Sequence, residues 1–156
     1  MRRAGFSLIE TLVLLAVLGA LLAVAAAYAR PDDSRRAAES LRSAVLWGRA
    51  NAIWRGVSVA VTEAPAGGGF VVRAAATPAA PCGEGTELAS VRLSQHPGVR
   101  LEAGLPRGLV WLADGSGRSC DGGGVISATV RFVGPRRAHH VVVSSLGRVR
   151  IEQVDP

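Results

Sequence analysis

A long apolar segment near the amino terminus constrains this chain more than any other feature. A basic leader, residues 1–5, precedes it, and from Phe6 to Tyr28 the chain runs for 23 residues interrupted only by Glu10 and two small polar residues. As a helix rising about 1.5 Å per residue, this segment spans roughly 35 Å, enough to cross a hydrocarbon core of about 30 Å. We therefore expect residues 6–29 to form one transmembrane helix, with the leader in the cytoplasm.

An ordinary secretory signal peptide is the alternative interpretation of this segment. A basic start, an apolar centre and Ala27-Tyr28-Ala29 before Arg30 also fit a peptide that is removed on export. That interpretation does not account for Glu10. Because a carboxylate deep in the bilayer costs about 2.5 kcal/mol or more, it is normally retained for a partner. A free amine created close by would be a natural partner.

The residues around Glu10 resemble a known processing site. Gly5-Phe6-Ser7-Leu8-Ile9-Glu10 is similar to the site that prepilin peptidase cuts in type IV prepilins and in the pseudopilins of type II secretion. The resemblance implies cleavage after Gly5 and methylation of the new amino terminus on Phe6. It also implies that Glu10 pairs with the amine of a neighbouring subunit during filament assembly. Such a pair compensates two buried charges only when both are present and close.

A second helical stretch follows a break at residues 30–33, where Pro31 disfavours helix in the residue before it and Asp is a good N-cap. From Ser34 apolar residues recur at helical spacing, and we expect the helix to end at Gly56. The expected buried face holds Ala38, Leu41, Val45, Ala52 and Ile53, with Arg35, Arg36, Arg42 and Arg49 mostly outside it. The prediction is one long, kinked helix, with residues 30–56 exported and packed on a sheet, the plan that pilins share.

Beyond Gly56 the sequence changes to short β-like runs separated by Gly and Pro. Gly67-Gly68-Gly69 is typical of a hairpin tip, and residues 75–81 form a loop of small residues. The runs are residues 57–62, 70–74, 88–93, 99–101, 109–112, 125–133, 138–144 and 148–154. They predict an antiparallel β domain over residues 57–156, and hence an α+β fold in which a long helix packs on a sheet.

Two later segments, Asp114–Arg118 and Ser145–Arg150, make the chain similar to the GspH/FimT branch of the pilin superfamily. This resemblance implies a minor pseudopilin or pilin, anchored in the inner membrane by one span, with its carboxyl-terminal domain in the periplasm. Its expected partners are prepilin peptidase, other pilin or pseudopilin subunits and the membrane. A type II secretion role is slightly favoured over a type IV pilus role.

Both cysteines, Cys82 and Cys120, lie in the part expected to be exported, where thiols are readily oxidised. A disulfide between them would close a loop of nearly 40 residues and stabilise the domain by about 3–4 kcal/mol. The alternative is two unpaired thiols.

Catalytic chemistry and metal binding are not indicated. The sequence holds no Cys-x-x-Cys, no phosphate-binding Gly-Lys-Ser, no His-Glu-x-x-His and no Gly-x-Ser-x-Gly. The cysteines and the three histidines, His96, His139 and His140, show no zinc-type spacing. Neighbouring residues in a strand point to opposite faces, so we expect one packed and one exposed ring from His139 and His140. We predict neither an enzyme nor a bound cofactor.

Basic charge gathers near the carboxyl terminus, and this feature supports a second functional hypothesis. The net charge is +6, and residues 122–151 hold no acid but five arginines: Arg131, Arg136, Arg137, Arg148 and Arg150. If the last two strands pair, Arg136, Arg137, Arg148 and Arg150 could form a patch that contacts phosphates of double-stranded DNA. Gly147-Arg148-Val149-Arg150 is similar to the motif that FimT-type minor pilins use for DNA uptake in natural transformation. Arginines on an edge strand also discourage aggregation between sheets.

Overall fold

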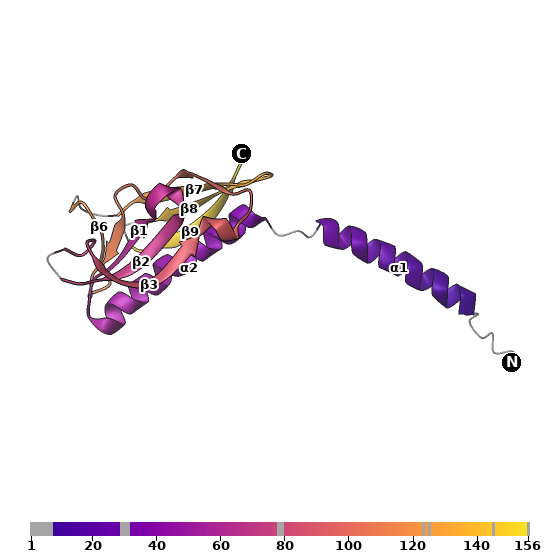
Figure 1. Ribbon diagram of the computed structural model, residues 1–156, viewed down its shortest axis with the longest axis horizontal. Helices are drawn as coiled ribbons and strands as arrows, with labels where there is room; N and C mark the ends of the chain where they lie inside the picture. Colours follow the sequence, from indigo (N-terminus) through magenta and orange to yellow (C-terminus); the bar gives the residue numbers. More distant parts are fainter. Residues whose placement is uncertain are drawn as a thin grey trace. The chain divides into compact units, whose positions relative to one another are not determined.

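The computed structural model describes residues 8–28, 32–77, 80–122, 124, 126–144 and 146–155. The chain divides into two units, residues 1–31 and 32–156, and Figure 1 labels both helices and most of the strands. The elements are α1 (Leu8–Tyr28), α2 (Asp33–Arg55), β1 (Val59–Glu63), a 3₁₀ turn (Pro65–Gly67), β2 (Gly69–Ala75), β3 (Gly85–Arg92), a second 3₁₀ turn (Leu93–Gln95), β4 (Arg100–Ala103), β5 (Leu109–Trp111), β6 (Gly117–Ser119), β7 (Ala128–Val133), β8 (Ala138–Val143) and β9 (Val149–Val154).

The first unit contains α1, a helix of 21 residues. Its segment Leu8–Ala25 has a mean hydropathy of 2.6, is long enough to cross a membrane, and has no buried residues. The predicted apolar helix is therefore present. Gly5 and Phe6, and the predicted kink near Pro31, lie outside the described residues.

Helix α2 begins and ends where the sequence indicates. Asp32 is the N-cap, and its Oδ1 accepts from the Ser34 backbone N–H at 3.2 Å. Gly56 ends the helix in the left-handed conformation, with φ of 67°. The buried face is made largely of small residues, so the helix lies close to the strands. At Gly48 an added Cβ would be 3.4 Å from Val72 Cγ1.

Ile53 was expected on the buried face of α2, and this expectation is wrong. Its exposed fraction is 53%, whereas Ala52 is fully buried. One residue turns a helix by about 100°, and this step takes Ile53 from the buried position of Ala52 past the edge of the buried face. There the Ile53 side chain lies near the turn at Gly115.

The strands form two antiparallel sheets rather than one. Their strand orders are β3-β2-β1-β5-β6 and β4-β7-β8-β9, and α2 contacts strands of both. Figure 1 shows the strands gathered on one side of α2. The antiparallel prediction is confirmed, but β6 was not predicted, because Gly117-Arg118-Ser119 carries no apolar residue and no β-branched residue.

The core lies between α2 and the two sheets. Phe70 of β2 meets Phe132 of β7 edge-to-face, with ring centroids 6.1 Å apart, and joins the sheets at that point. Side chains alternate between the two faces of the sheet along β1, β2 and β5. On the face away from this core, these strands also carry buried apolar residues: Ala60, Val71 and Val110. The five-stranded sheet is therefore covered on both faces over these strands.

Candidate functional surfaces

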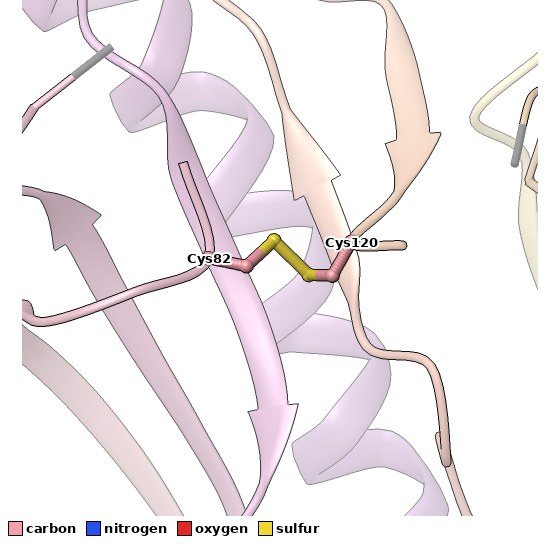
Figure 2. The surroundings of a disulfide bond; sticks show 2 residues. All are labelled: Cys82 and Cys120. Carbon is pink, nitrogen blue, oxygen red and sulfur yellow. A yellow bond between two sulfur atoms is a disulfide. The ribbon is translucent and has the colours of Figure 1, made fainter. Parts of the chain in front are cut away.

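Cys82 and Cys120 form a disulfide, with an S–S distance of 1.96 Å and Cα atoms 5.6 Å apart. The predicted pairing is confirmed. Cys82 lies in the connection before β3 and Cys120 follows β6, and these two strands are opposite edges of one sheet. Figure 2 shows the bond in front of a strand, with a helix on the far side. The disulfide thus holds a loop across the sheet face that carries Ala60, Val71 and Val110.

The four arginines of the predicted basic patch do not come together. Arg136 and Arg137 occupy the turn between β7 and β8, as expected. In the pairing of β8 with β9, Ala138 lies opposite Val154, whereas Val142 lies opposite Arg150. Arg148 and Arg150 are therefore at the other end of β8 from the two turn arginines. The expected cluster of four is corrected to two pairs of exposed arginines.

Some of these charges are also paired with acids. The Arg150 Nε atom lies 2.9 Å from Glu152 Oε1, and Arg131 Nε lies 3.0 Å from Glu102 Oε2. Both glutamates lie outside the acid-free stretch of the sequence, and strand pairing brings Glu102 back to β7. The charge of Arg150 is thus partly offset by Glu152.

The turn that carries Arg148 packs against α2 through Gly147. This glycine has φ of 76°, and an added Cβ would lie 2.8 Å from Arg49 Nη1 and 3.1 Å from Trp111 Cη2. Arg49 stacks over the Trp111 ring at 5.4 Å, and its Nε donates to the Gly115 carbonyl at 3.1 Å. Arg49 was expected to lie outside the buried face of α2, but it is half-buried and lies beside the arginine turn.

These residues border one cleft, lined by Arg49, Trp111, residues 114–118, Gly124 and Leu146. Hydrogen bonds from Ser116 to Asp114 lower the pKa of that carboxyl, so it stays charged at neutral pH. Arg49 and Arg118 are the cations of the cleft. The sequence gives little signal for this grouping, since its members come from a helix and two distant turns.

The two neighbouring histidines lie as expected, one packed and one half-exposed. His139 is 3% exposed, and its Nδ1 lies 2.9 Å from Ser34 Oγ. Ser34 Oγ also lies 2.7 Å from Asp32 Oδ1 and donates to the Arg137 carbonyl, 3.0 Å away. All of these contacts lie at the start of α2. Within the described residues no group of three His, Cys, Asp or Glu is placed to hold a metal ion.

Residues 37–147 match the family described as Type II transport protein GspH. The chain belongs to the GspH family. None of the curated proteins matches the sequence. Two solved structures share the fold. The minor pseudopilin EpsH from the Type 2 Secretion System of Vibrio cholerae is 15% identical, with a TM-score of 0.56 over 78% of this chain and 98% of that chain. The type IV minor pilin FimU of Pseudomonas aeruginosa is 13% identical, with a TM-score of 0.55 over 76% of this chain and 87% of that chain.

The GspH assignment and the fold agree with the expected α+β, pilin-like architecture. The chain is a minor pseudopilin or pilin, of the class used by type II secretion systems or type IV pili. The family model describes a type II transport protein, and the fold is shared with EpsH, a minor pseudopilin. The family assignment and the apolar helix α1 together indicate a single-pass, membrane-anchored protein with a soluble domain.

Proposed function

We propose that this protein is a minor pseudopilin of a type II secretion system. Prepilin peptidase cuts it after Gly5, and the new amino terminus on Phe6 is methylated. Residues 6–29 anchor it in the inner membrane, and the domain from Asp32 onward faces the periplasm. The observation that carries this proposal is the GspH match over residues 37–147, joined to an apolar helix with no buried residue in the Leu8–Ala25 segment.

Glu10 has a definite part in this proposal. It lies in the first turn of α1, within the segment that enters lipid. A carboxylate there is stabilised when a neighbouring subunit brings the methylated amine of its own Phe6 close to it. Assembly is then favoured by pairing two charges that are each costly alone, and the filament forms by packing, with no bond made or broken.

Cleavage of the full chain tests the processing step. On co-expression with a prepilin peptidase, the wild-type protein should lose residues 1–5, and Gly5→Ala should accumulate as the uncut precursor. Mass spectrometry of the amino terminus measures both. Cleavage after Ala29 in both proteins would contradict the proposal and return the signal-peptide interpretation.

Binding of double-stranded DNA is a second candidate function, favoured by the geometry of the Gly147 turn. Gly147 packs on Arg49 and Trp111, and the next residue, Arg148, is exposed. The candidate contact is then Arg148 and Arg150, on the side of the chain opposite the buried Val149, and the pair at the β7–β8 turn is left out. Such contacts bind phosphates without reading base sequence and weaken steeply with salt.

A gel shift of the fragment 32–156 with duplex DNA at low salt decides this second candidate. Arg148→Ala with Arg150→Ala should abolish the shift. The matched control is Arg136→Ala with Arg137→Ala, which removes the same charge from the other end of β8 and should bind nearly as the wild type does. Equal loss in both double variants would indicate a general charge effect and count against a site at the Gly147 turn.

A further inference from the structure

The solvent-exposed face of α2 changes character halfway along the helix. In the first half it carries ion pairs: Arg35 Nε lies 2.9 Å from Glu39 Oε1, and Arg36 Nη1 lies 3.6 Å from Asp33 Oδ1. In the second half the exposed face is mainly apolar. Its members are Leu46, Trp47, Ala50, Ile53 and Trp54, which we call the tryptophan stripe.

The tryptophan stripe is a contiguous surface. Trp47 and Trp54 are seven residues apart, two helical turns, and Leu46, Ala50 and Ile53 fill the same side between them. Trp54 is 82% exposed and Trp47 is 43% exposed. Two of the three tryptophans of the chain are thus displayed on one stretch of helix. Scattered single apolar residues are normal on a surface, but a group that includes two tryptophans is typical of a protein interface.

Charge around the stripe indicates what kind of partner fits it. Residues 40–62 contain no acid but hold Arg42, Arg49 and Arg55. Arg42 and Arg49 are also seven apart, so they run along one side of the stripe. Two copies meeting face to face would bring two helix segments together that both carry basic residues and no acid, and like charges oppose such contact. A partner with an apolar centre bordered by Asp or Glu would match both features.

A bilayer surface fits this face less well. A helix that lies in the membrane interface needs an apolar face along its whole length. On α2 the first half of the exposed face carries the ion pairs of Arg35 with Glu39 and of Arg36 with Asp33, so the apolar face does not continue along the helix. The apolar surface is short and local, as a protein contact requires.

We propose that the tryptophan stripe is the docking face for another pilin-like subunit, whose contact surface is apolar at its centre and acidic at its border. This inference rests on the proposed function, in that it takes assembly with sibling subunits as given and assigns the face that makes the contact. Trp54 and Trp47 are the anchors, because large aromatic residues carry most of the binding free energy in such interfaces.

Binding of the soluble domain to its siblings tests this proposal. The fragment 32–156 is suitable, because its core lies entirely within that unit and the Leu8–Ala25 segment is not buried. The probes are the exported domains of the other pilin-like subunits of the same secretion system, each added separately and followed by calorimetry. Tryptophan emission should shift to the blue on binding, because Trp47 and Trp54 leave water while Trp111 is already buried.

Two double variants on the exposed face of α2 are compared, one in the tryptophan stripe and one in the polar half. Trp47→Ser with Trp54→Ser should weaken binding to the sibling domain by about tenfold or more. The matched control, Arg35→Ala with Glu39→Ala, changes the polar half of the same face and should alter binding by about twofold or less. Circular dichroism checks that both variants keep the wild-type helix content.

Three results would overturn the proposal: no sibling domain binds the wild type, the tryptophan variant binds as tightly as the wild type, or only vesicles of phosphatidylglycerol bind. Failure of the proposed function looks different, because the full-length wild type would then be uncut by prepilin peptidase. If the full-length chain is cut and joins the filament fraction equally with and without the two tryptophans, the function stands and the docking face is wrong.

Discussion

At the scale of single residues, Gly147 shows why the β8–β9 turn can approach α2 closely. Its positive φ favours glycine, and an added Cβ would lie 2.8 Å from Arg49 Nη1 and 3.1 Å from Trp111 Cη2, closer than ordinary van der Waals contact. The presence of glycine in the Gly147-Arg148-Val149-Arg150 segment is therefore explained by packing, independently of any DNA contact. It lets the β8–β9 turn rest on α2.

Substitution of Gly147 tests this packing. Gly147→Ala should destabilise the fragment 32–156 by about 1–3 kcal/mol more than Gly122→Ala does, because the added methyl meets the rigid Trp111 ring. Gly122 is the matched control, since its φ of 74° is similar and nothing lies within 4 Å of an added Cβ. Urea denaturation of both variants measures the difference, and equal losses would show that only backbone strain matters.

Some residue-level features could be read from the sequence, and others could not. An Asp N-cap within residues 30–33 and the helix end at Gly56 were predicted correctly, because capping depends on neighbours within a few residues. The pairing of Cys82 with Cys120 was also predicted, since the chain has no other cysteine. The contact of Arg49 with Trp111 and Gly115 was missed, because residues more than 60 positions apart meet only after the sheets form.

At the scale of elements, the start of α2 is fixed to the start of β8 by a buried hydrogen-bond group. Ser34 Oγ has one proton, and the Asp32 carboxylate and the Arg137 carbonyl are both acceptors of it. His139 Nδ1 must therefore carry a proton and donate to Ser34 Oγ. A neutral ring with its proton on Nδ1 satisfies this arrangement.

This group makes the stability of the domain depend on pH. Burial lowers the pKa of His139 below its ordinary value of 6.5, and Arg35 and Arg137 add to the lowering while Asp32 opposes it. Between the lowered pKa and 6.5 the unfolded chain binds more protons than the folded one, so the free energy of unfolding falls as the pH drops through that window. Denaturation curves of the fragment 32–156, taken from above pH 6.5 downward, should show this fall.

Two single variants separate His139 from other titrating groups. His139→Asn keeps a donor near the Nδ1 position and removes the titration, so its stability should change less with pH below 6.5 than that of the wild type. His140→Asn is the control, because His140 is half-exposed on the opposite side of β8 and should keep the wild-type pH dependence. A flattened profile in the His140 variant would show that the wrong histidine has been assigned.

At the scale of the whole molecule, the disulfide is the covalent link between opposite edges of the five-stranded sheet. It closes a loop across a sequence separation of 38 residues. Cys82→Ser with Cys120→Ser should lower the free energy of unfolding by about 4 kcal/mol, mainly by freeing the unfolded chain. Urea denaturation measures this loss, and the wild type in reducing buffer should match the variant. An unchanged midpoint in both would contradict the prediction.

The architecture as a whole was predictable in its parts and less so in their arrangement. The apolar helix, the second helix and most strands follow from periodicity and from Gly and Pro punctuation. The division into two sheets depends on which strands pair, which local sequence does not specify. The same limit explains why the prediction of one basic patch was wrong. Strand register, which local sequence does not specify, places Arg137 and Arg150 at opposite ends of β8.

Helix α2 also determines how the domain bears mechanical load. It is the first element of the second unit, so a pull on the anchor reaches the domain through it. It is held by packing along its length, by Ser34 on the Arg137 carbonyl near its start and by Arg49 on the Gly115 carbonyl in its second half. Tension along the helix therefore shears many small contacts at once. Under force, α2 should slide from the sheets before the five-stranded sheet opens.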